Sequence, residues 1–341
     1  MQLPRVRWDA LLLCFLPAGC ALIPEHTDDP APRRRGPIPS RVQQPIRLGT
    51  LAFRPRGAAT EAPGHASLDI ESAYSSVFEN GTNGSNQTVV LDGEIWTNTL
   101  ITKVGLSERA DVELDLGVLY ASNGFLDGLI ENYHSLFGFP DGGRENRPRD
   151  VYDMSVQKGT QTIYTLEPNE LELLDTPLVF TERFVDESAN MPALALRLGV
   201  DLPTGSETSG TGNGAWDWGG GVVAEKNCGR WSFTGALDWV DAKRPSSFTG
   251  SGVQAYDGLD LQLGSEYRWN DKLSLLVGTN YVPPVTRDMT LKEIDRDVLA
   301  LDVGAAWDTG TDSTIHVGIE EDLMSASGPD ITFFVGWMTR L

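Results

Sequence analysis

The segment "ADVELDLGVLY", residues 110–120, decides the fold because its side chains alternate strictly in character. One side of an extended backbone carries the apolar members, Val112, Leu114, Leu116, Val118 and Tyr120. The other side carries Glu113, Asp115 and Gly117. A period of two belongs to a β-strand, in which successive side chains point to opposite faces. The segment therefore predicts a strand with one apolar and one acidic face.

The same period recurs from residue 67 to the C-terminus. It is clear in "SLDIESAYSSVF" (67–78), "ALALRLGVDLPTG" (193–205), "RWSFTGALDW" (230–239) and "GLDLQLGSEY" (258–267), and again in residues 273–281, 297–307, 313–321 and 331–341. Two architectures fit this pattern. In a soluble β-sandwich the apolar faces meet inside, whereas in an outer-membrane barrel they face lipid and the polar faces line the lumen.

Three features favour the barrel. Many segments have about ten residues, which is the length that a tilted strand needs to cross a bilayer. Short connections such as "NCGR" alternate with long polar ones such as "TGSETSGTGNG", as periplasmic turns alternate with external loops. Aromatic residues gather near strand ends, as an interfacial girdle requires: Tyr74, Tyr120, Trp216, Trp231, Trp239, Tyr267, Tyr281, Trp307 and Trp337.

The pattern predicts an antiparallel transmembrane β-barrel of about twelve strands, an even number that returns both ends to the periplasm. The predicted strands begin near Ala66, Thr88, Ala110, Tyr152, Pro192, Ala215, Arg230, Gln254, Lys272, Arg296, Ser313 and Ile331. Residues 166–191, which include "TPLVFTERF", leave room for a further strand. The end of the chain, "ITFFVGWMTRL", resembles the terminal strand that the outer-membrane assembly machinery recognises.

In this register twelve acidic side chains point into the lumen: Asp69, Glu71, Glu113, Asp115, Asp201, Asp217, Glu225, Asp238, Asp260, Glu266, Asp302 and Glu320. Arg197 and Arg230 are their main counterparts. Unpaired carboxylates are costly to bury dry, so the wall implies water, bound cations or protonation. Because rings of Asp and Glu favour cations, we predict weak cation selectivity, increased when residues 125–137 are deleted.

Charge is distributed unevenly along the chain. The formal net charge is −21, yet residues 57–341 contain 18 Lys and Arg against 44 Asp and Glu. A body this acidic repels nucleic acid, so nucleic-acid binding is excluded as a function.

The first 19 residues are typical of an export signal. Arg5 and Arg7 precede the apolar core "ALLLCFLPAG" (10–19), which is too short to span a bilayer. The following "LPAGC" resembles the lipobox of bacterial lipoproteins, in which the cysteine, here Cys20, is acylated. An ordinary cleaved signal with an incidental Cys20 is the alternative. Residues 20–64, rich in Pro and Arg, predict an extended, mobile periplasmic linker before a barrel at 65–341.

Cysteine usage indicates no disulfide. Cys14 leaves with the signal and Cys20 carries the lipid, so Cys228 stands alone. Neither a disulfide framework nor a cysteine-based metal site is expected, and the sequence predicts no metal and no cofactor.

One insert breaks the alternation, "NGFLDGLIENYHSLFGFPDGGRENRPRD" (123–150). Its apolar residues recur at helical spacing: Phe125, Leu126, Leu129, Ile130, Tyr133, Leu136 and Phe137. Ser122 or Asn123 can cap this helix, Gly138 suits its C-terminal position, and Pro140 stops it. The topology places the helix in an extracellular loop. It can close the rim, lie on the outer leaflet, or sit in or over the mouth, which we expect.

The insert resembles the most characteristic stretch of an uncharacterised bacterial outer-membrane family, domain-of-unknown-function family 3187. There a G-F-L-D-x-x-I-x-x-x-H-x-x-F-G-x-P-x-G-G-R run follows an early strand. The matching positions are Gly124, Phe125, Leu126, Asp127, Ile130, His134, Phe137, Gly138, Pro140, Gly142, Gly143 and Arg144. "ALRLGVDLPTGS" (195–206) resembles a later strand of the same group. The resemblance covers residues 46–341 and implies an outer-membrane barrel, with no established activity.

Catalysis is the competing hypothesis. Of four histidines only His134 and His316 are placed to act, and a hydrolase needs a nucleophile, a base and an orienting acid together. Ser135, beside His134, points in a different direction on a helix, and His316 is expected in the lumen wall. Catalytic residues are therefore not predicted.

The sequence thus predicts a lipid-tethered outer-membrane barrel that is not an enzyme. Its expected role is passive or gated passage of small solutes, or structural support of the envelope. Expected partners are outer-membrane lipids and the assembly machinery. The alternatives are an outer-membrane lipid-modifying hydrolase and a soluble β-sandwich lipoprotein.

Overall fold

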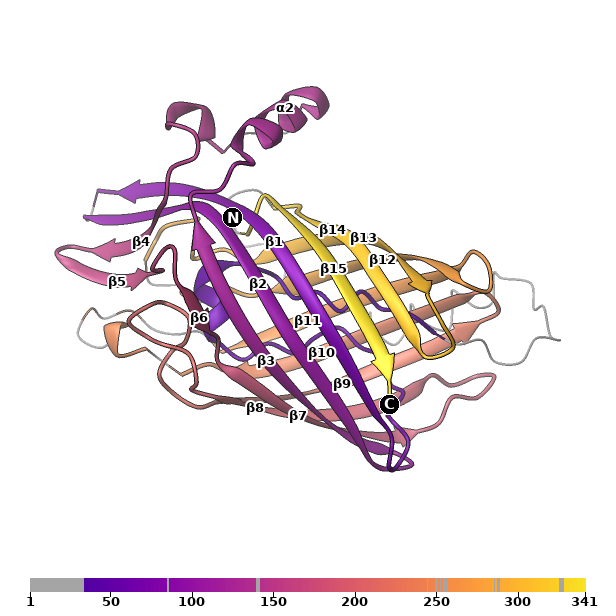
Figure 1. Cartoon of the computed structure of the whole chain (residues 1–341). Coiled ribbons are helices and arrows are strands. Elements are labelled where there is room, and N and C mark those ends of the chain that lie inside the picture. The colour runs from indigo at the N-terminus through magenta and orange to yellow at the C-terminus, as the bar shows by residue number, and fades with distance from the viewer. Residues whose placement is uncertain are drawn as a thin grey trace, which may run out of the picture.

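A closed ring of antiparallel strands forms the body of the protein (Figure 1). A computed structural model describes residues 34–84, 86–138, 142–243, 245–248, 251, 253, 257–284, 286, 289–324 and 328–341. Within these residues the ring has twelve strands: β1 (Ala66–Asn83), β2 (Gln87–Ser107), β3 (Ala110–Ser122), β7 (Thr176–Val185), β8 (Ala193–Leu202), β9 (Asp217–Cys228), β10 (Trp231–Asp241), β11 (Gly258–Arg268), β12 (Leu273–Val282), β13 (Val298–Asp308), β14 (Ser313–Asp322) and β15 (Ile331–Arg340).

The first and last strands close the ring. β1 pairs with β15 from Ser67↔Arg340 to Ser76↔Ile331, and the Leu341 amide donates to the Ala66 carbonyl at 2.7 Å. A closed sheet leaves no unpaired edge, which is the condition for a sheet to cross a bilayer. The predicted twelve-stranded barrel is therefore confirmed, and the β-sandwich alternative is wrong.

The fourth wall strand is not the predicted one. The sequence placed it near Tyr152, but β7 takes this position between β3 and β8. β4 (Asp153–Lys158) and β5 (Gln161–Thr165) instead form a hairpin on the outer end of β2, and β6 (Leu171–Leu173) pairs with β3. The alternation of β7 is obscured because Pro177 lies near its start and charged Glu182 is exposed on its outer face.

The exterior of the wall is apolar. Large aliphatic side chains are exposed on strands all around the ring: Ile70, Leu100, Leu116, Leu198, Val222, Leu263, Leu275, Val303, Val317 and Val335. Aromatic side chains lie near the strand ends, where Trp231 packs on Phe233 and Tyr267 with ring centroids 5.9 and 4.8 Å apart. An apolar band flanked by aromatic girdles is the surface of an outer-membrane barrel.

The connections fix the orientation. Both ends of the barrel domain and the short turns, such as that between β9 and β10, lie at one end, which is therefore periplasmic. The long connections lie at the other, extracellular end. None of the helices in the described ranges is long and apolar enough to cross a membrane.

Cys228, the last residue of β9, is disulfide-bonded, so the expectation that it stands alone is wrong. Its partner, the signal segment and Cys20 lie outside the described residues. Lipidation of Cys20 stays a prediction, and a Cys20 sulfur held in a disulfide cannot also carry a lipid.

We expect the protein to fractionate with the outer membrane and to migrate at a heat-dependent position on denaturing gels. The reason is that a closed barrel has no free edge at which detergent can start to unfold it. Gel mobility before and after boiling checks this. A chain that stays soluble without detergent after removal of residues 1–20 would show that the wall does not face lipid.

Candidate functional site

Carboxylates line the inner face of the wall. Of the twelve acids assigned to the lumen from the sequence, eleven are buried: Glu71, Glu113, Asp115, Asp201, Asp217, Glu225, Asp238, Asp260, Glu266, Asp302 and Glu320. Asp69 is half-buried, and Asp111 is a further buried acid of the same face. Arg230 is exposed in the turn before β10 and does not oppose them.

Residues 34–64, here called the lumen segment, run inside the barrel (Figure 1). The segment starts at the periplasmic end, where Arg35 donates to Asp308 (Nε–Oδ2 2.8 Å) and to Ser274 (2.9 Å). It turns in a short 3-10 helix, η2 (Pro45–Gly49), near the extracellular end, and returns to enter β1 at Ala66. The described part of the expected linker is therefore extended but not a free tether, because it lies in the lumen.

Opposite charge explains this placement. The lumen segment contains six Arg and one Glu, whereas residues 65–341 contain 18 Lys and Arg against 43 Asp and Glu. A chain with few apolar residues cannot fold alone, but its guanidinium groups can neutralise buried carboxylates that are otherwise costly. The basic segment therefore supplies counter-ions for the buried carboxylates of the wall.

Two arginines hold the returning limb. Arg54 lies between Glu71 of β1 (Nη1–Oε1 2.9 Å) and Asp115 of β3 (Nε–Oδ2 2.6 Å). Arg56 binds Asp111 of β3 through both terminal nitrogens (3.1 and 2.8 Å) and donates to Thr181 of β7 at 3.0 Å. Such charge-assisted, bidentate contacts are the strong class of hydrogen bond.

The wall also holds the backbone of the segment. Arg197 of β8 forms a buried bidentate pair with Asp238 of β10, donates to the Arg54 carbonyl at 2.7 Å, and lies 4.8 Å over the Phe53 ring. Gln262 of β11 donates to the Phe53 carbonyl at 2.6 Å. These contacts fix the limb along its length.

The extracellular end is closed by apolar packing. Ile46 and Leu48 of η2 belong to a buried cluster. Its other members come from the inner faces of β1 to β3, the β4–β5 hairpin and the external loops: Val77, Val89, Leu91, Ile95, Leu119, Ala121, Met154, Val156, Ile163, Leu166, Leu174, Phe248, Val253, Met289, Leu291 and Ile294. Between β5 and the loops after β8 and β10, a cavity of about 280 Å³ lies beside Ile46 and Phe248.

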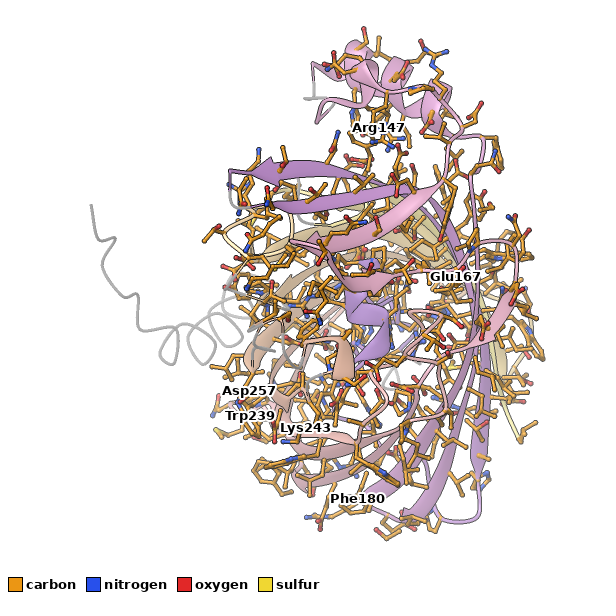
Figure 2. All side chains as sticks on the ribbon, turned by 90° about the vertical axis from the view of Figure 1, so that its left-hand side faces the viewer. Arg147, Glu167, Phe180, Trp239, Lys243 and Asp257 are labelled. Carbon is orange, nitrogen blue, oxygen red and sulfur yellow. The ribbon has the colours of Figure 1, made fainter. Side chains whose placement is uncertain are left out.

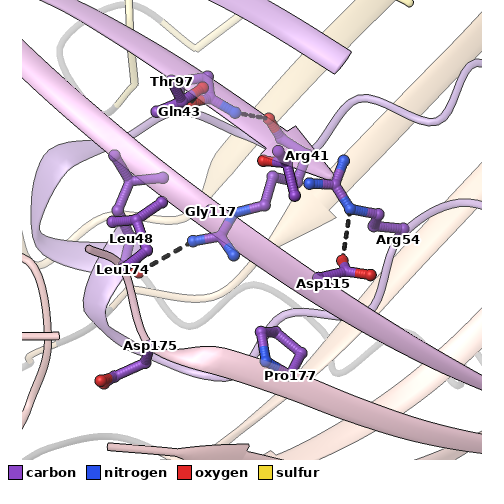
Figure 3. A pocket seen from close by; sticks show the side chains of 11 residues that line it. Arg41, Gln43, Leu48, Arg54, Thr97, Asp115, Gly117, Leu174, Asp175 and Pro177 are labelled. Carbon is purple, nitrogen blue, oxygen red and sulfur yellow. Dashed lines mark hydrogen bonds and ion pairs between the residues drawn. The ribbon is translucent and has the colours of Figure 1, made fainter. Parts of the chain in front are cut away.

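Figure 3 shows the side chains around a small void where the lumen segment meets the wall beside η2. Arg41 donates to the Leu48 carbonyl at 3.0 Å, and Thr97 of β2 donates to Gln43 at 2.9 Å. The void among them is about 10 Å³, room for about one water molecule. Nearby Asp175 accepts hydrogen bonds from the backbone amides of Gly205 and Asn213 in the β8–β9 loop. Burial raises the pKa of the Asp175 carboxyl to about 6, and these two hydrogen bonds partly offset the increase.

The insert does not sit in or over the mouth, so that expectation is wrong. Its helix, α2 (Asp127–Phe137), lies to one side of the ring beside the extracellular end of β1 (Figures 1 and 2). Phe125 stacks on the outward-facing Tyr74 with ring centroids 5.8 Å apart. Leu126 and Ile130 pack with Ile331 at the start of β15.

Glu94, an outward-facing acid of β2, anchors the start of the insert. Its carboxylate accepts from the backbone amides of Phe125 (2.8 Å) and Leu126 (2.5 Å). Gly124 has φ +69°, and a Cβ there would come within 1.8 Å of the carboxyl carbon. The helix begins later than predicted, at Asp127, and its first residues have no side-chain cap of their own. Glu94 takes the place of the cap that was expected from Ser122 or Asn123, because its carboxylate binds the free amides at the start of the helix.

Arg144 holds the rest of the motif together. It pairs with Asp127 and Asp330, donates to Ser76, and lies 4.8 Å over the Phe78 ring. The other motif positions are structural: Phe137 ends α2, Gly138 caps it with φ +75°, and Gly142 and Gly143 lead into the turn with φ +63° and +98°. Pro140 lies outside the described residues. Arg147, labelled in Figure 2, pairs with Asp92 of β2 at 2.8 Å.

Replacing Arg144 with Met is expected to detach the insert. Asp127 would be left buried and Asp330 half-buried without their cation, and breaking a buried pair costs about 3–5 kcal/mol. Protease cleavage within residues 123–150 should then become fast while heat-dependent mobility is kept. Arg149→Met is the matched control, because Arg149 is exposed and pairs only at the surface with Glu131. Equal cleavage of both variants would contradict the role of Arg144.

The two histidines lie in different parts of the molecule. His316 points into the lumen, and its Nε2 lies 2.6 Å from the Arg35 carbonyl. His134 is buried on the wall-facing side of α2, in a different part of the molecule. The two are held apart by the wall itself.

Sequence reasoning missed the cations of the lumen. Arg35, Arg54 and Arg56 were assigned to a linker, although a basic segment before an acidic body was a visible signal. Their partners lie up to 273 positions away in the chain, so no local pattern could identify them.

One comparison with a solved structure agrees with the fold. The COG4313 outer membrane channel from Pseudomonas putida F1 is similar over 84% of this chain and 99% of its own, with a TM-score of 0.56 and 16% identity. The P. putida toluene transporter TodX matches over 81% and 89% (TM-score 0.35, 10% identity). The translocator domain of the autotransporter NalP from Neisseria meningitidis matches over 82% and 90% (TM-score 0.41, 11% identity). No curated protein matches the chain.

A family model described as "Protein of unknown function (DUF3187)" matches residues 10–341. The match includes the insert at residues 123–150, and it also includes the whole lumen segment, residues 34–64. The chain therefore belongs to the DUF3187 family.

Proposed function

We propose that the protein is a gated outer-membrane channel for small solutes and that the lumen segment is its gate. One observation carries this proposal: the segment forms a hairpin whose two ends both lie at the periplasmic end of the barrel. A hairpin so placed can withdraw toward the periplasm without threading through the wall. Along the returning limb the contacts with the wall include hydrogen bonds and ion pairs, which water can replace. Apolar packing of Ile46, Leu48 and Phe53 adds to the stability of the closed state.

The charge of the wall supports a preference for cations. Withdrawal removes the arginines that neutralise Glu71, Asp111 and Asp115 and leaves an acidic, hydrated lumen. Acidic rings around a pore favour cations. The similar protein from P. putida F1 is itself described as an outer membrane channel, which agrees with this function.

A structural role in the envelope is the second candidate. It is favoured by the apolar cluster that closes the extracellular end around Ile46 and Leu48. Single-channel recording of the full chain in planar bilayers separates the two candidates. A gated channel should be closed for most of the time, with brief cation-preferring openings. A silent bilayer at every voltage, with folded protein present, would favour the structural role.

A further inference from the structure

α2 carries a wide apolar face, and the barrel covers only half of it. Leu126 and Ile130 face the wall and are buried. Phe125, Leu129 and Leu136 are 72%, 53% and 78% exposed. At 100° per residue these two groups form adjacent stripes on one side of the helix. Apart from the Tyr74 ring against Phe125, the structure describes no residue that covers the second stripe.

The polar edge of the helix lies on a different side. Glu131 pairs with Arg149, and Ser135 is exposed. The helix therefore has three sides: one on the wall, one apolar and free, and one polar and hydrated. This distribution is that of an amphipathic helix at a membrane surface.

The height of α2 along the barrel matches the membrane boundary. Phe125 stacks on Tyr74, and Tyr74 pairs across the sheet with Trp96 of β2 and Phe333 of β15. Trp96 is 44% exposed on the outer wall and Phe333 is 38% exposed. These residues belong to the extracellular aromatic girdle, where the acyl layer meets the headgroups. The free stripe of α2 thus continues the lipid-facing surface of the wall.

The anchors keep the helix at this place. Glu94 holds its start, and Arg144 ties Asp127 to Asp330 at the rim. An isolated helix of eleven residues is marginal in water, so its free apolar side needs a partner. We propose that α2 lies in the outer leaflet of the membrane, with Phe125, Leu129 and Leu136 among lipid acyl chains. This inference is independent of the channel proposal.

Fluorescence quenching by lipid tests the inference directly. Leu136→Cys and, as matched control, Ser135→Cys are each labelled with an environment-sensitive thiol dye in the full chain. The unmodified chain, whose Cys228 is disulfide-bonded, measures background labelling. The folded proteins are reconstituted into phosphatidylcholine vesicles with or without brominated acyl chains. We expect strong quenching by brominated chains at position 136 and weak quenching at position 135.

Two results would overturn the inference. Weak quenching at both positions would place the free stripe in water. Blue-shifted emission at 136 without quenching, together with dimeric elution, would show that a second copy covers the helix. Leu129→Cys, about two turns earlier on the same stripe, should behave as Leu136→Cys does and keeps the test valid if one variant fails to assemble.

Discussion

Removal of residues 34–64 is expected to convert a mostly closed barrel into a permanently open, cation-selective channel. The deletion takes six Arg and one Glu out of the lumen and leaves the buried wall carboxylates facing an aqueous space. Carboxylates that lose their counter-ions gain hydration instead, so the barrel should still assemble. Single-channel conductance and the reversal potential in a salt gradient measure both effects.

The insert provides the control for this deletion. Because α2 lies outside the ring, removal of residues 125–137 should leave conductance and selectivity unchanged. This expectation replaces the sequence-based one, which required the helix in or over the mouth. A barrel without residues 34–64 that stays closed would mean that the apolar cluster at the extracellular end, rather than the lumen segment, blocks passage.

Substituting Arg54 with Met is expected to shift the gate toward its open state. The change leaves Glu71 and Asp115 buried and unpaired, at a cost of about 3–5 kcal/mol to the closed state. Since each 1.4 kcal/mol is a factor of ten, the ratio of open to closed channels should rise by roughly a hundredfold or more. Open probability in single-channel records measures this ratio.

Two further variants separate charge from side-chain volume. Arg34→Met removes a guanidinium whose described contact is the Gly229 carbonyl at 3.3 Å, so open probability should change little. In the variant Arg54→Met/Glu71→Gln/Asp115→Asn the uncompensated carboxylates are also gone, and closing should be partly restored. An Arg54→Met channel no more open than the Arg34→Met channel would exclude a gating role for the Arg54 pairs.

The wall could be predicted because its signal is local. Alternation over ten residues sets which side chains face lipid, and the closed sheet then follows from the absence of water in the bilayer. β7 lies in residues 166–191, where the sequence left room for a further strand, but it was not counted in the wall because Pro177 and exposed Glu182 interrupt the alternation. The C-terminal half, where such interruptions are rare, matches the predicted strands closely, as β13 to β15 illustrate.

The contents of the lumen could not be predicted because they depend on distant partners. Arg54 meets Glu71 and Asp115 only after the ring has closed, so a segment without a core of its own was interpreted as a tether. The insert shows the same limit. Helical spacing predicted α2 correctly, but its position depends on Glu94 of β2 and on Asp330, which lies just before β15.

A reversible cross-link between the lumen segment and the barrel tests the central claim most directly. A Cβ at Gly49, at the tip of the hairpin, would lie 3.1 Å from the Cα of Gly212 in the β8–β9 loop, which brings cysteines at these two positions within reach of a disulfide. The double variant Gly49→Cys/Gly212→Cys fixes the tip at the extracellular end, so the hairpin cannot withdraw toward the periplasm. Gly49→Cys/Glu266→Cys is the control, because Glu266 lies near the periplasmic end of β11, where no cross-link to the tip should form.

The measurement is the open probability of the oxidised double variant before and after a reductant is added, with the unmodified chain treated in the same way. Peptide mass mapping shows whether positions 49 and 212 are joined. We predict a linked, silent barrel whose openings return on reduction. A linked barrel that opens as often as the unmodified chain, or a chain in which the two positions never join, would contradict a lumen gated by its own N-terminal segment.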